Sequence, residues 1–124
     1  MQGHEPSDAQ ISPLSGGMIF IALCLNRRSY TVKQLAEPFR RFQNTSKRIS
    51  QKASARKDEL NAADVYLEKA ARYACLCLEA LGMAQSFGGD EFTLTRYGRE
   101  LLESDKLRSR HEPSYRAFEV VMKK

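Results

Sequence analysis

An eight-residue apolar run, MIFIALCL at positions 18–25, is the feature that most limits how this chain can fold. The spacing of one buried helix face, i, i+3, i+4, i+7, is met by Met18, Ile21, Ala22 and Leu25. The residues between them are apolar too, so the helix is hydrophobic on nearly every side. The run is far shorter than the ~20 residues that cross a bilayer. The pattern therefore predicts a helix over residues 15–28 at the centre of a core, and no membrane partner.

A second helix is predicted to begin at Val32. Thr31 is a favourable N-cap residue, and Leu35 and Phe39 then share one face. Pro38 interrupts this pattern, because an interior proline loses a hydrogen bond and clashes with the preceding turn. We expect Pro38 either to end the helix at position 37 or to start a new one. Residues 40–61 fit a basic helix from about 46 to 57 or a loop.

A long helix is predicted from Ala62 to Leu81, with Gly82 placed where a helix-ending glycine belongs. Its core face is predicted to consist of Ala63, Leu67, Ala70, Ala74, Cys77 or Leu78, and Leu81. Beside it runs a second stripe formed by Tyr66, Tyr73 and Leu76. This stripe either packs under another part of the chain or forms a subunit interface.

The most informative stretch follows this helix. Residues 83–87 and 91–94, joined by Gly88, Gly89 and Asp90, have the pattern of a β-hairpin with a glycine-rich turn. Thr95 then caps a short helix over 96–103. The charged residues 104–113 are predicted to be a linker, and 114–123 a C-terminal helix. Residues 1–14 are expected to be a flexible tail.

Charge is concentrated in one quarter of the chain. The whole chain carries +5, but residues 26–57 hold ten Lys and Arg against Glu37 alone, which gives +9 locally. Such a local field favours a polyanionic partner. The predicted function is therefore contact with an anionic macromolecule.

Three short segments carry a resemblance to a known superfamily. The runs LEALGM at 78–83, FTLT at 92–95 and GRELL at 98–102 resemble the helix–wing–helix signature of the winged helix-turn-helix DNA-binding superfamily. Residues 31–39 resemble the first helix of its helix-turn-helix pair. The resemblance covers residues 15–103 and implies a mainly α fold with a small β-hairpin. The chain would add a basic insertion at 40–61 and an extra C-terminal helix within 104–124.

The resemblance implies double-stranded DNA as the partner, with a helix in the major groove and the wing on the backbone or minor groove. The basic side chains would bind phosphates and their polar neighbours would add hydrogen bonds. The predicted DNA contacts are Arg40, Arg41, Asn44, Thr45, Ser46, Lys47, Arg48, Gln51, Lys52, Arg56, Lys57 and the wing glycines Gly88 and Gly89. We expect the basic segment and the wing to form one continuous surface.

Two placements of the basic segment remain open. Residues 45–57 would be the recognition helix itself, or they would be an inserted arm that grips the DNA backbone beside a long structural helix. About twenty residues separate Phe39 from Ala62, and the long helix begins with Asp64 and Glu68, which face phosphates poorly. The second placement is preferred, because the wing should directly follow the third helix.

The C-terminal helix predicts a homodimer. Its apolar face, formed by Tyr115, Phe118, Val121 and Met122, follows a charged linker, which suits packing against a second copy. Cys75 and Cys77 point about 200° apart on a helix. With the two histidines in the tail and linker, no metal-ligand set is predicted.

No phosphate-binding loop, nucleophile elbow or carboxylate pair points to an enzyme, and no cofactor is expected. Three cysteines, an odd number and too few for a disulfide scaffold, favour the cytoplasm. The chain is thus predicted to be a homodimeric transcriptional regulator that binds DNA. The alternatives are a winged-helix protein-interaction or dimerisation module, or an accessory DNA-binding subunit of a replication, mobile-element or phage-defence system.

Overall fold

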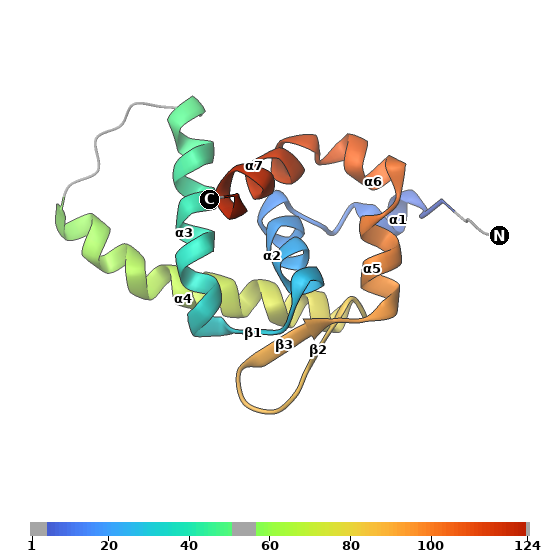
Figure 1. Cartoon of the computed structure of the whole chain (residues 1–124), viewed down its shortest axis with the longest axis horizontal. Coiled ribbons are helices and arrows are strands. Elements are labelled where there is room, and N and C mark those ends of the chain that lie inside the picture. The colour runs from blue at the N-terminus through green and yellow to red at the C-terminus, as the bar shows by residue number, and fades with distance from the viewer. Residues whose placement is uncertain (1–4, 51–56, 124) are drawn as a thin grey trace.

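The protein is mainly helical and carries one small antiparallel sheet of three strands (Figure 1). A computed structural model describes residues 5–50 and 57–123; the side chains of 46–50 and 57–65 lie outside that description. In chain order the elements are α1 (Asp8–Ile11), α2 (Gly16–Arg27), β1 (Tyr30–Thr31), α3 (Val32–Ser50), α4 (Lys57–Ala80), β2 (Ala84–Ser86), β3 (Glu91–Leu94), α5 (Arg96–Leu102), α6 (Asp105–Arg110) and α7 (Glu112–Met122). The expectation of a mainly α chain with a small hairpin is confirmed.

The apolar helix α2 lies at the centre of the molecule, as its sequence predicts. Ser15 caps it, and residues 19–25 are all buried. Helices α3, α4, α5 and α7 and strand β3 pack around it. Phe20 on α2 stacks on Phe42 of α3 at a centroid distance of 4.5 Å and meets Phe118 of α7 edge-on at 5.8 Å. Contacts on all sides explain why α2 has no polar face.

Helix α3 begins where the sequence predicts but continues further. The Thr31 hydroxyl accepts a hydrogen bond from the Gln34 N–H, and the Gln34 side chain accepts one from the Thr31 N–H. The expected break at Pro38 does not occur, and the helix runs through it to Ser50. An interior proline costs about 3 kcal/mol. Burial of Phe39 and Phe42, each contributing about 1.5–3 kcal/mol, offsets that cost.

The hairpin forms as predicted and gains a third strand that the sequence analysis did not foresee. Ala84 pairs with Leu94 and Ser86 with Phe92 across β2 and β3. Strand β1 pairs with the other edge of β3, placing Tyr30 opposite Phe92. The hairpin is therefore joined to the junction between α2 and α3.

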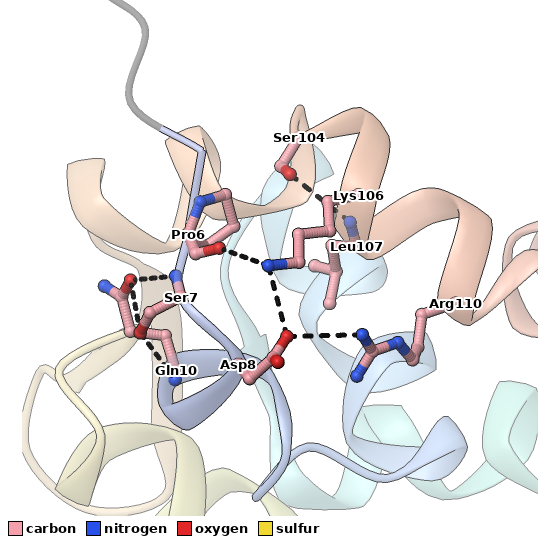
Figure 2. A network of polar contacts seen from close by, with 8 residues as sticks. All are labelled: Pro6, Ser7, Asp8, Gln10, Ser104, Lys106, Leu107 and Arg110. Carbon is pink, nitrogen blue, oxygen red and sulfur yellow. Dashed lines mark hydrogen bonds and ion pairs between the residues drawn. The ribbon is translucent and has the colours of Figure 1, made fainter.

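Residues 6–14 differ from the flexible tail that the sequence analysis predicts. Ser7 and Gln10 form a capping box at α1, and Ile11 and Leu14 are buried in the core. Asp8 lies 3.1 Å from Lys106 Nζ on α6, which also donates to the Pro6 carbonyl oxygen (Figure 2). Apolar anchoring and these charged contacts hold the segment against α6.

The prediction of a linker at 104–113 is also wrong, because this segment forms α6 and the start of α7. Ser104 caps α6, and α7 follows almost directly. Tyr115 and Val121 are buried, and the Tyr115 hydroxyl donates to the Leu102 carbonyl oxygen at 2.7 Å. Phe118 and Met122 pack against the same core. The face proposed for dimerisation is thus used within the chain, because a short connection folds α7 back onto α2 and α3 (Figure 1).

Helix α4 begins at Lys57, five residues before the predicted start. Leu67, Ala74 and Leu78 are buried as predicted, and Cys75 joins them. Leu81, which the spacing assigns to the core, is exposed. The second stripe, Tyr66, Tyr73 and Leu76, is not packed under any described part of the chain.

Candidate nucleic-acid interface

The hairpin turn is fixed at both of its sides. Gly88 and Gly89 have φ values of +100° and +62°, a backbone region that favours glycine, and both open onto free space. The Asp90 carboxylate accepts two hydrogen bonds from the Arg72 guanidinium on α4, at 2.6 and 3.0 Å. Its backbone oxygen accepts one from the Val32 N–H at 3.0 Å. Arg72 holds the pKa of Asp90 below its usual range, so this acid stays ionised and paired.

Two cations flank β1 beside this hairpin, and the sequence analysis did not place them in the site. Arg28 lies over the Tyr30 ring at 4.3 Å, and Lys33 lies exposed in the first turn of α3. The neighbouring acid Glu91 accepts a hydrogen bond from the Ser29 hydroxyl at 2.7 Å. The +9 stretch already includes both cations, but only the pairing of β1 with β3 places them near the turn.

The first cations of the predicted basic segment have partners within the chain. Glu37 lies 3.8 Å from Arg40 and 3.5 Å from Arg41, one turn along α3. Arg41 also donates to the Val121 carbonyl oxygen on α7. Asn44 is exposed and Thr45 is half-buried. Arg40 and Arg41 therefore face a carboxylate as well as solvent.

The remaining members of the predicted site lie in or beyond the last turns of α3. Ser46, Lys47 and Arg48 belong to the helical backbone of α3, and Lys57 is the first residue of α4. The side chains of these four residues lie outside the description. Gln51, Lys52 and Arg56 lie outside the described residues altogether.

The basic segment and the wing do not lie side by side. Figure 1 places the hairpin at the end of the molecule where α3 begins, and the end of α3 at Ser50 on the opposite side. A helix of 19 residues spans about 28 Å. The expected continuous surface is therefore replaced by two basic regions: one beside the wing, around Arg28 and Lys33, and one at the far end of α3, around Lys47 and Arg48.

The cysteines and acids form no metal centre in the part of the chain that the structure describes. Cys24 and Cys75 are buried, and burial raises the pKa of each thiol to about 12. Among the described residues, no group of three or more His, Cys, Asp or Glu could hold an ion.

A small hollow between α1 and α5 is lined partly by Glu5 and Glu100. Beside it the Gln10 side chain donates to the Tyr97 hydroxyl at 2.9 Å. The other lining residues of the hollow are Pro6, Gln10, Tyr97 and Leu101.

The described helices include none with the length and apolar character needed to span a bilayer. Comparisons of the chain with models of protein families, with curated proteins and with solved structures found no match. The fold and the candidate site therefore rest on this chain's own residues and geometry.

Proposed function

We propose that this chain is a winged helix-turn-helix protein that binds double-stranded DNA and regulates transcription. The order α2, β1, α3, α4, β2, β3 supports the proposal, since a winged helix joins two helices, a third helix and a hairpin in this sequence. The sheet order β1-β3-β2, which ties the hairpin to the helix pair, supports it too. A cytoplasmic location stays a prediction.

The observation that carries the proposal is the excess charge. Residues 26–57 hold ten Lys and Arg against one acid, and this stretch covers all of α3 and both of its ends. Phosphate contacts from such cations supply affinity that does not depend on base sequence. DNA running along α3 would meet Arg28 and Lys33 at one end and Lys47 and Arg48 at the other.

The test is the salt dependence of binding to a random DNA duplex. The double variant Lys47→Ala/Arg48→Ala is expected to weaken binding to all sequences and to lower the slope of log K against log salt by about 2. Arg28→Ala/Lys33→Ala tests the other end of α3 in the same way.

Arg96→Ala/Arg116→Ala is the matched control. These cations lie on α5 and α7, each beside a glutamate on its own helix, and the slope should not change. An unchanged slope in both test variants, or no binding at low salt, contradicts the proposal.

One observation favours a second candidate, a protein-interaction module. Tyr66, Tyr73 and Leu76 are exposed on α4, and exposed aromatic side chains are typical of protein–protein interfaces. A gel-shift titration with random duplex at two salt concentrations separates the candidates. A DNA-binding protein retards the duplex, and more weakly at the higher salt concentration, whereas a protein-interaction module does not retard it.

A further inference from the structure

Helix α4 carries apolar side chains on two opposite faces. Its inward face is buried and consists of Leu67, Ala71, Ala74, Cys75 and Leu78. Tyr66, Tyr73 and Leu76 are 63%, 71% and 47% exposed. At about 100° per residue they fall within a sector of about 80°, centred roughly 165° from the inward face. We call this sector, with Lys69 and Ala80, the α4 outer face.

The composition of the α4 outer face is unusual for a side of a helix that faces water. A surface helix normally presents charged and polar residues there. Among residues 66–80, Lys69 is the one charged residue in this sector. Tyrosine and leucine with few charges are typical of the core of a protein–protein interface. The face therefore has the character of a contact surface.

The charges along this helix indicate what covers it. Lys69 lies near the start of the face and Glu79 borders its end, ten residues or about 15 Å further along. In an antiparallel pair of α4 helices, each Lys69 lies opposite the Glu79 of the other copy. In a parallel pair, like charges would meet, which is unfavourable.

We propose that the α4 outer face binds a second copy of this chain, with the two α4 helices antiparallel about a two-fold axis near Ala74. Such an interface is isologous, so the same patch serves both subunits. Tyr73 lies one residue from the axis and meets the Tyr73 of the partner subunit. Tyr66 reaches the end of the partner's α4, near Leu81, which is also exposed.

A single-stranded nucleic acid is a weaker fit to this face. Tyrosines can stack on bases, but such sites also need a positively charged groove along the strand. Glu68 and Glu79 border the face, and the nearby Arg72 is paired with Asp90. The face therefore lacks the excess of cations that a phosphate backbone requires.

The proposal is independent of DNA binding and is tested without DNA. Sedimentation equilibrium of the full chain is expected to show a reversible dimer with a Kd in the micromolar range. Tyr73→Asp should weaken dimerisation at least about tenfold, because it places two carboxylates beside the axis. The matched control is Val120→Asp on α7, where the side chain is 66% exposed but lies on another helix.

A wild-type chain that stays monomeric at concentrations of about 100 μM contradicts the proposal. A dimer that Tyr73→Asp leaves intact contradicts it too, as does equal weakening by Val120→Asp. Circular dichroism checks that each variant is folded, and both sites are exposed enough for a charge to be tolerated.

A charge exchange tests the antiparallel arrangement. Lys69→Glu and Glu79→Lys should each weaken the dimer, because each puts like charges opposite one another. The double variant Lys69→Glu/Glu79→Lys restores opposite charges and should recover most of the affinity. Ser86→Ala is the control for Glu79, which accepts a hydrogen bond from the Ser86 hydroxyl. A double variant no tighter than the single ones overturns the arrangement.

Discussion

At the scale of single residues, Gly98 shows how closely the short helix α5 approaches the hairpin. A Cβ atom at this position would collide with the Met83 carbonyl oxygen and meet the Leu94 side chain at 2.9 Å. The Thr95 N–H donates to the same carbonyl oxygen at 2.8 Å, so the backbone cannot move away freely. The glycine of the GRELL segment is thus required by packing.

Gly98→Ala is therefore expected to lower the free energy of unfolding by about 1–3 kcal/mol, the usual range for overpacking. Gly17→Ala is the matched control, since its Cβ would meet the Phe39 ring at an ordinary 3.5 Å. That change should be neutral or slightly stabilising. Urea denaturation followed by circular dichroism measures both. Equal stability of the two variants would show that the close contact at Gly98 is relieved without cost.

At the scale of elements, the hairpin is held to α4 through the Arg72–Asp90 pair. Asp90→Asn should speed amide exchange in β2 and β3 while the amides of the central helix α2 keep their protection. Because Arg72 lowers the pKa of Asp90, the pair contributes at pH values above the ordinary aspartate pKa of 3.8 and is lost as the pH falls through the lowered value. Acidification should therefore loosen the wild-type hairpin and leave Asp90→Asn unchanged.

Hydrogen exchange read by mass spectrometry across a pH series measures this effect. Glu100→Gln is the control, because its ion pair with Arg96 lies within α5 and does not touch the hairpin. Equal exchange rates of the hairpin amides in wild type and Asp90→Asn at neutral pH would contradict this prediction. They would show that the backbone hydrogen bonds to β1 are sufficient to hold the hairpin in place.

At the scale of the whole molecule, the helices that pack on α2 should unfold together. Phe20 contacts aromatic rings from both α3 and α7, so Phe20→Ala removes contacts to two elements at once. We expect a loss of about 3–5 kcal/mol in one cooperative transition, a large share of the 5–15 kcal/mol typical of a domain. Val120→Ala, on the exposed side of α7, should change stability by less than about 0.5 kcal/mol.

Urea denaturation followed by helical circular dichroism and by tyrosine fluorescence tests this cooperativity. The two signals should coincide. A separate early transition in the tyrosine signal would mean that part of the molecule unfolds independently of the helical core.

Much of the fold could be predicted from the sequence because the signals are local. The spacing of α2, the caps Thr31 and Thr95, and the glycines of the hairpin turn each act within a few residues. The +9 stretch is likewise visible in the sequence alone. These features were sufficient to predict a mainly helical chain with a hairpin and to propose a polyanionic partner.

Other features depended on contacts between residues distant in the chain. Whether α3 passes through Pro38 depended on the burial of Phe39 and Phe42, and whether β1 forms depended on Phe92, some sixty residues away. The Asp8–Lys106 contact joins the two ends of the chain in the same way. Patterns within a short stretch of sequence do not predict contacts between residues so far apart in the chain.

The sequence by itself determined which residues are apolar, which are charged and where the chain turns, because these follow from short-range chemistry. Only the tertiary structure decided which apolar faces find partners. It buried the face of α7 that the sequence predicts to be free for dimerisation, and it left Tyr66 and Tyr73 on α4 exposed. It also separated the wing from the far end of the basic helix (Figure 1). The reason is physical: periodicity shows that a face is apolar, but what covers that face depends on how all the elements pack together.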